Sequence, residues 1–192
     1  MKPTEVFRDL PTLKTKRLIL RKMTMADAPA VYAYGRDPEV TKYLAFPTHK
    51  SVADATSFLR DTQRRYRKGE PAPWAIVRAS DGQLMGSIGL LNYAPNGERV
   101  EAGYALHRPY WGQGYGTEAF NAVIRFAFQK LKVNRVQAIC AVENARSYHV
   151  MKKCGLRFEG VMRQYGKLQG KTHDMKLYAI LREDWLKARN KP

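Results

Sequence analysis

The chain has few cysteines, and it lacks the long apolar segment that a membrane span requires. Cys140 and Cys154 are the two cysteines among 192 residues, so we expect free thiols in a reducing cytoplasm. No apolar run approaches the roughly 20 residues of a transmembrane helix, and residues 1–9 lack the apolar core of a secretory signal. The composition predicts one cytoplasmic globular domain over residues 1–192, with residues 1–14 as an N-terminal arm.

Motifs for metals and for two common nucleotide sites are also missing. The four histidines, at 49, 107, 149 and 173, are scattered along the chain and do not have the spacing of metal ligands. There is no Gly-Lys-Ser/Thr phosphate loop. The third glycine and the acidic residue of the dinucleotide fingerprint do not occur at their usual spacing. We therefore expect no metal and neither type of nucleotide site.

Acidic residues are scarce relative to basic ones. The chain has 17 Asp and Glu against 34 Lys and Arg, a net charge of +17. Such a surface attracts polyanions, including RNA, acidic proteins and phosphorylated cofactors. The densest basic cluster, residues 64–68, falls at the end of a predicted helix, where cations also complement the helix dipole. The charge leaves three interpretations open: a generic surface, a polyphosphate cofactor, or contact with the ribosome or other RNA.

The first half of the chain has the pattern of helices followed by short strands. A strand is expected over 17–21, then a helix over 25–34 capped by Thr24, and a helix over 51–68 capped by Ser51. The Asp37-Pro38 pair breaks the chain between these helices. Strands are predicted over 74–77, 84–93 and 100–106, joined by turns at 80–82 and 95–97, which is typical of an antiparallel meander.

The second half contains the clearest helix. Apolar residues recur at helical spacing over 116–131. A buried strand over 136–142 follows, then a helix from Asn144 to Cys154-Gly155, and strands over 156–162 and 175–181. The strand–helix–strand unit over 100–142 predicts a parallel pair with a crossover. We expect an α/β (α+β) domain with a central mixed, mostly antiparallel sheet and helices on both faces.

A glycine-rich loop precedes the long helix, at Trp111-Gly112-Gln113-Gly114-Tyr115-Gly116-Thr117. Glycines allow a ligand to approach the backbone closely, and a helix N-terminus attracts phosphate. Alone, this pattern fits a tight turn as well as a phosphate cradle. Its position between a strand and a long amphipathic helix favours the cradle.

Several motifs in one order resemble the GNAT superfamily of acyl-CoA-dependent N-acetyltransferases. The family signature Arg/Gln-x-x-Gly-x-Gly/Ala matches residues 111–116, with Trp111 in the first position. That departure is similar to the branch that acetylates ribosomal-protein N-termini, the RimJ/RimL-like enzymes. Further matches lie at 17–21, 86–90, 101–106, 144–147, 153–156 and 158–160. The resemblance extends over about residues 15–185 and implies a GNAT-like single domain.

The resemblance also implies how the site is arranged. Backbone groups of 104–106 would run along the pantetheine arm of acetyl-CoA, with the Leu106 N–H at the thioester carbonyl. Many GNAT enzymes protonate the leaving thiolate with a tyrosine, but the matching position here is Met151. Ser147 matches the serine of RimL-like enzymes, and Tyr148 is the reserve candidate. The implied cofactor contacts are Tyr104, Ala105, Leu106, Trp111, Gly112, Gln113, Gly114, Tyr115, Gly116, Thr117, Asn144 and Ser147.

A general base is harder to assign. Glu101 is our candidate, because a strand carboxylate near the pantetheine could take a proton from the amine through a water. RimL-like enzymes carry a glutamate a few residues after the Glu-Gly pair, but residues 161–166 hold no carboxylate. An α-amine has a pKa near 8 and lysine one near 10.4, so the missing carboxylate favours an α-amine. Tyr43, Phe46 and Tyr93 are predicted by analogy to line the acceptor site.

Three functions remain open on the sequence. The first is acetylation of the N-terminal α-amine of a protein, such as a ribosomal protein, by direct attack in a ternary complex. The second is acetylation of a small amine such as an antibiotic, polyamine or amino acid. The third is a non-catalytic module that binds CoA or the ribosome. Either a monomer or a homodimer is compatible with the sequence.

Overall fold

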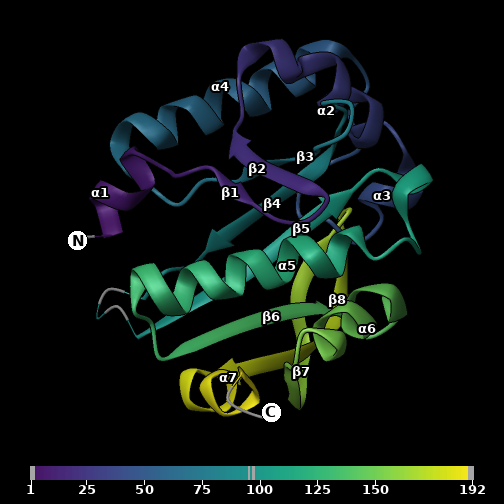
Figure 1. Ribbon diagram of the computed structural model, residues 1–192. Coiled ribbons are helices and arrows are strands. Elements are labelled where there is room, and N and C mark those ends of the chain that lie inside the picture. The colour runs from purple at the N-terminus through teal and green to yellow at the C-terminus, as the bar shows by residue number, and fades with distance from the viewer. Residues whose placement is uncertain (1–2, 95, 97, 190–192) are drawn as a thin grey trace.

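The computed structural model describes residues 3–94, 96 and 98–189, which form a mixture of helices and strands (Figure 1). The helical segments are α1 (Pro3–Arg8), η1 (Met25–Asp27), α2 (Ala28–Gly35), α3 (Pro38–Thr41), α4 (Val52–Lys68), η2 (Arg108–Tyr110), α5 (Tyr115–Phe126), η3 (Ala127–Leu131), α6 (Ala145–Lys153) and α7 (Arg182–Arg189). The strands are β1 (Leu13–Lys14), β2 (Leu18–Lys22), β3 (Trp74–Arg78), β4 (Leu84–Leu91), β5 (Arg99–Leu106), β6 (Arg135–Ala141), β7 (Arg157–Leu168) and β8 (Lys171–Leu181).

All eight strands form one sheet in the order β1-β2-β3-β4-β5-β6-β8-β7. Each neighbouring pair is antiparallel except β5 and β6, which are parallel. This confirms the predicted mixed, mostly antiparallel sheet and the parallel pair joined through the long helix. The parallel pairing is short, because it runs only from Arg99↔Arg135 to Glu101↔Gln137.

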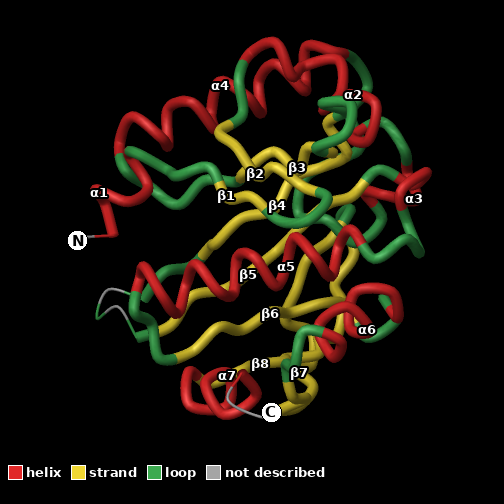
Figure 2. The backbone as a smooth tube through the Cα atoms, viewed as in Figure 1, coloured by secondary structure: helices red, strands yellow, loops and turns green. Residues whose placement is uncertain are grey.

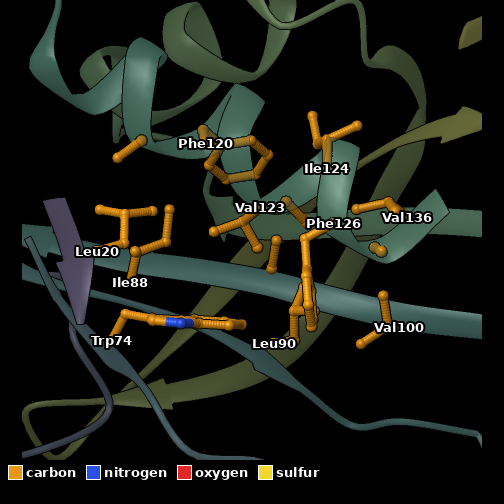
Figure 3. Packing of buried hydrophobic residues seen from close by; sticks show 14 of the residues in the cluster. Leu20, Trp74, Ile88, Leu90, Val100, Phe120, Val123, Ile124, Phe126 and Val136 are labelled. Carbon is orange, nitrogen blue, oxygen red and sulfur yellow. The ribbon is translucent and has the colours of Figure 1, made fainter. Parts of the chain in front are cut away.

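Helices cover both faces of the sheet, as predicted. Helices α2 and α4 lie on one side and α5 on the other (Figures 1 and 2). The α5 side holds the larger apolar cluster, in which Trp74 of β3 packs edge-on against Phe126 at 5.4 Å between ring centroids (Figure 3). The Trp74 indole also donates to the Pro11 carbonyl, so Trp74 is a core residue.

Local sequence signals set most helix boundaries. Ser51 and Asp54 form a capping box at the start of α4, and Gly69 ends that helix with φ of 68°. A Cβ on Gly69 would collide with the Thr4 carbonyl, so this C-cap requires glycine. Thr24 and Asp27 form a second capping box. Both helix starts agree with the sequence prediction.

Other segments differ from the prediction. The helix expected over 116–131 is α5 followed by a π-helical turn, η3. The Asp37-Pro38 break begins the short helix α3, because Asp37 caps it and Pro38 occupies its first turn. Helices α1 and α7 were not expected. Of the predicted N-terminal arm, residues 3–14 form α1 and β1, and Phe7 is buried in the core. The predicted turn at 95–97 includes Pro95 and Gly97, which lie outside the described residues.

The β7–β8 hairpin is much longer than the strands predicted over 156–162 and 175–181. Its turn is Gln169-Gly170, with positive φ at both residues, as two-residue hairpin turns require. The Gln169 side-chain amide donates to the carbonyl oxygens of Thr41, Leu44 and Phe46. The hairpin tip is thereby tied to the segment that follows α3. Among the described residues, no helix is long and apolar enough to span a bilayer.

Candidate functional site

The sheet opens between β5 and β6 after residue 101. Beyond that point β5 continues to Leu106 and β6 to Ala141 without further pairing between them. Strand β6 instead stays paired with β8 along its whole length. One edge of β5, from Ala102 to Leu106, therefore faces an opening in the sheet.

The β4–β5 register determines which backbone groups face this opening. His107 N donates to Met85 O at 2.7 Å, and alternation along the same register makes Ala105 and Ser87 the next hydrogen-bonded pair. The N–H groups of Tyr104 and Leu106 then point away from β4, into the opening. These donors can pair with the amides and the thioester carbonyl of a pantetheine arm. This geometry fits the Leu106 role that the sequence predicts.

The glycine-rich loop borders the same opening. Gly112 and Gly114 have φ of 75° and 81°, a left-handed conformation that side chains disfavour. Gly114 is the N-cap of α5, and the first backbone bond of the helix runs from Glu118 N to Gly114 O. The N–H groups of residues 115–117 thus have no partner within the helix. The loop fits a pyrophosphate group that approaches the backbone closely.

A partly buried carboxylate, that of Glu118, fixes this loop in place. Glu118 accepts hydrogen bonds from the Thr15 hydroxyl at 2.7 Å and from the backbone N and Nε of Arg17 at 2.9 and 2.6 Å. Arg17 in turn donates to the Gln113 carbonyl at 3.0 Å and stacks on the Tyr115 ring. Burial disfavours ionisation of Glu118, but the hydrogen bonds from Thr15 and Arg17 outweigh it and lower the pKa of Glu118.

Glu118 should therefore contribute to stability in a pH-dependent way. A lowered pKa in the folded state means that the contribution is present above the ordinary value of 4.5 and is lost as the pH falls through the folded pKa. Glu118→Gln should cost about 1–3 kcal/mol at pH 7, and its stability should depend less on pH below 4.5 than that of the unmodified protein. Denaturant unfolding from pH 7 to 3 measures this. An equal decrease in the free energy of unfolding below pH 4.5 in the two proteins would contradict it.

The opening and the loop form one cavity of about 610 Å³. It lies among α3, the end of β5, the glycine-rich loop and the start of α6. Its lining residues are Glu39, Val40, Lys42, Tyr43, Leu44, Tyr104, Ala105, Leu106, Tyr110, Trp111, Gly112, Gly114, Gly116, Thr117, Glu143, Asn144, Ala145, Arg146, Ser147, His149, Val150 and Lys153. Most of the predicted cofactor contacts are brought together here. Gln113 and Tyr115 instead shape the loop through their contacts with Pro109 and Arg17.

Trp111 connects the two walls of the cavity. Its indole N–H donates to the Leu106 carbonyl at 2.6 Å, and the Arg146 guanidinium stacks on its ring at 4.6 Å. The indole thus engages the Leu106 carbonyl and leaves the Leu106 N–H for a ligand. This gives a structural role to the tryptophan that stands where the family signature has Arg or Gln.

Ser147 faces the cavity beside Tyr104. Its backbone N–H is held by the Asn144 side chain at 3.2 Å, which caps α6. Burial raises the pKa of the Tyr104 phenol, and the Ser147 hydroxyl partly offsets that rise. Burial also raises the pKa of the Cys140 thiol to about 11, and the Ser147 hydroxyl partly offsets this rise as well. Ser147 is therefore close to both groups.

The other two predicted catalytic residues lie apart from this cavity. Glu101 is at the closed end of the opening, where Gln137 donates to it at 3.4 Å, about 10 Å along the strand from Tyr104. Tyr148 stacks on Tyr178 under the Lys176 ammonium. Neither residue is among the described residues that line the cavity.

Two of the three predicted acceptor-site aromatics also lie elsewhere. Phe46 packs on His49 and Phe58, and Tyr93 packs on Phe7. Tyr43 does line the cavity.

Helix α3 and Glu143 both contribute to the cavity lining, and neither contribution was predicted from the sequence. Helix α3 is four residues long, too short to give a periodic pattern, and its segment is anchored in part by Gln169 from across the molecule. Glu143 immediately precedes the α6 cap and reads as an ordinary surface residue. In the described residues no group of three or more His, Cys, Asp or Glu could hold a metal, and the absence of a metal stays a prediction.

Comparison with known proteins identifies related sequences. A family model described as an acetyltransferase (GNAT) domain matches residues 17–157. The uncharacterized N-acetyltransferase YoaA of Bacillus subtilis is 32% identical over 172 residues, 90% of this chain and 97% of YoaA. YdaF of the same organism, named as a candidate ribosomal N-acetyltransferase, is 31% identical over 146 residues, 75% of this chain and 79% of YdaF.

Solved structures have the same fold. The crystal structure of a GNAT-family acetyltransferase from Bacillus anthracis superposes with a TM-score of 0.81 and 29% sequence identity. The match covers 90% of this chain and 99% of that chain. Sequence and fold therefore point to the same family.

Proposed function

Because the chain belongs to the acetyltransferase (GNAT) domain family, and is thus an acetyl-CoA-dependent N-acetyltransferase, we propose that its acceptor is the N-terminal α-amine of a protein such as a ribosomal protein. The observation that carries the proposal is the charge of the cavity lining. Two described lining residues are carboxylates, Glu39 and Glu143, and three are cations, Lys42, Arg146 and Lys153. Polyamines and aminoglycosides carry several positive charges, which such a lining disfavours. A single ammonium group is compatible with it.

The basicity of the acceptor supports the same choice. An α-amine with a pKa near 8 is far more often neutral at pH 7.5 than a lysine with a pKa near 10.4, by about 10²-fold. The similarity to YdaF is a second, weaker support for a ribosomal substrate.

The reaction we propose is direct attack of the amine on the thioester in a ternary complex. A covalent acetyl-enzyme would need a thiolate or another activated nucleophile. Burial raises the pKa of Cys140 to about 11 and that of Cys154 to about 12, so both remain protonated thiols at neutral pH. Initial rates measured with both substrates varied should give intersecting lines in double-reciprocal plots.

Ser147 is the proposed proton donor to the leaving thiolate. Ser147→Ala should lower kcat about 10-fold, a modest effect because a thiol with a pKa near 8.5 leaves well without help. Tyr148→Phe is the matched control, since Tyr148 packs on Tyr178 outside the cavity, and its kcat should stay within about 2-fold. Stopped-flow or steady-state thiol release measures both variants. Equal losses in the two would remove the assignment to Ser147.

A panel of acceptors tests the proposed function. The protein is incubated with acetyl-CoA and free N-terminal peptides, N-terminally blocked lysine peptides, spermidine, an aminoglycoside and free amino acids, with CoA release as the readout. We expect the N-terminal peptides to exceed the blocked lysine peptide by about 10²-fold in kcat/KM. Faster turnover of any small amine would overturn the choice of acceptor.

The net charge of +17 supports delivery of the enzyme to an anionic assembly such as the ribosome in the cytoplasm. Such an association depends on charge and should weaken steeply with salt. Co-sedimentation with ribosomes at 50 and 300 mM salt tests it. Binding that is absent at both concentrations would leave the charge as a generic surface property.

A further inference from the structure

The cavity wall opposite the glycine-rich loop is built from three distant segments. Tyr43, just after α3, packs edge-on against His173 of β8 at 6.4 Å between ring centroids. The His173 Nδ1 lies 3.7 Å from the Glu143 Oε2, which belongs to the loop between β6 and α6. Gln169 anchors the α3 segment to the β7–β8 hairpin through three carbonyls. The wall is thus held together by contacts that do not depend on a ligand.

Glu143 is a carboxylate of this wall, and it lies four residues before Ser147 in the sequence. It lines the cavity and directly precedes Asn144, whose side chain caps α6 at Ser147. Its side chain is 55% exposed, whereas that of His173 is 19% exposed, so the carboxylate is accessible and the imidazole backs it. Glu39, the other carboxylate among the described lining residues, lies on α3.

We propose that Glu143 binds the ammonium form of the acceptor amine and takes its first proton. The assignment rests on the proposed function, since it needs an amine acceptor. It replaces Glu101, which pairs with Gln137 at the closed end of the opening. A carboxylate attracts an ammonium by a charge-assisted hydrogen bond, and Glu143 lines the cavity where the acceptor would enter.

The proton balance of the reaction follows from this placement. The acceptor R–NH₃⁺ gives one proton to Glu143, and the neutral nitrogen attacks the thioester carbonyl carbon. The new oxyanion accepts from the Leu106 N–H while the C–N bond forms. The C–S bond then breaks, and the Ser147 hydroxyl gives its proton to the thiolate. The second proton that the nitrogen loses reprotonates Ser147. Glu143 releases its proton to solvent, so the net products are the amide, CoA-SH and one H⁺.

Two isosteric acceptors separate this role from a structural one. One peptide begins with alanine, and the other begins with 3,3-difluoroalanine, whose fluorines make the α-ammonium more acidic. Glu143→Gln should lower kcat/KM for the alanine peptide about 10²-fold but only a few-fold for the fluorinated peptide, which needs less help to lose its proton. The dissociation constant for acetyl-CoA, measured by calorimetry, should stay within about 2-fold.

A matched variant completes the experiment. Glu101→Gln removes the strand carboxylate, which lies outside the cavity lining, and should retain activity within about 3-fold. Equal losses on the two peptides in Glu143→Gln, or no loss on either, would overturn the assignment. If the unmodified protein acetylates neither peptide but acetylates another amine of the panel, the proposed acceptor fails. The Glu143→Gln comparison on that amine then tests Glu143 separately, and an unchanged rate there also overturns it.

Discussion

Gly114→Val is expected to raise the dissociation constant for acetyl-CoA at least about 100-fold, equivalent to about 2.7 kcal/mol. Gly114 is the N-cap of α5, has φ of 81° and lines the cavity. A valine there adds a branched side chain where the pyrophosphate would approach the helix N-terminus. It also strains a left-handed backbone position, which should cost about 1–2 kcal/mol of folding stability. Calorimetric titration of the folded variant measures the affinity.

Gly82→Val provides the matched control for backbone strain. Gly82 has φ of 72°, and a Cβ there would meet nothing within 4 Å. It lies in the turn before β4, outside the cavity lining. The control should lose a similar amount of stability in denaturant unfolding and keep its affinity for acetyl-CoA within about 2-fold. Similar affinity losses in both variants would mean that Gly114 acts through stability and does not cradle the cofactor.

Replacing the Leu106 peptide N–H by an ester oxygen is expected to lower kcat by about 10²–10³-fold, the usual cost of one lost oxyanion donor. Incorporation of the α-hydroxy analogue of leucine at position 106 makes this change and keeps the side chain, which is 5% exposed. The register of β4 and β5 directs this N–H into the opening of the sheet. The sheet therefore loses no ladder hydrogen bond, and stability should change little.

The same substitution at Ala105 is the control. The Ala105 N–H points toward Ser87 of β4, so its ester should cost about 1 kcal/mol of stability with kcat within about 3-fold. Steady-state rates at saturating acetyl-CoA compare the two ester proteins. A larger kcat loss at Ala105 than at Leu106 would show that the oxyanion donor is elsewhere.

Features encoded within one segment were predictable from the sequence. The Ser51 cap, the Gly69 terminus, the apolar face of α5 and the glycine-rich loop before it each depend on residues a few positions apart. The parallel β5–β6 pair followed from chain order and crossover geometry. Gly112, Gly114, Ser147 and Asn144 consequently meet in the cavity that the motifs indicated.

Features that depend on distant contacts were not predictable. The length of the hairpin was missed because most of β7 is exposed. Its large apolar residues Phe158, Val161 and Tyr165 are exposed as well, so no alternation of apolar and polar residues marks the strand. The position of Glu143 against His173 depends on the register of β8, and the position of Tyr43 depends on the Gln169 anchor. Glu101 was chosen from its strand and residue type, but the sheet is still closed at its level.

The most direct test of the account uses one peptide that carries both a free N-terminus and an internal lysine. The protein is incubated with this peptide and acetyl-CoA at pH 7.5, and tandem mass spectrometry locates the acetyl group. The account predicts acetylation of the α-amine in at least about nine of ten product molecules, since that amine is far more often neutral. Acetyl groups mainly on the lysine side chain would contradict it.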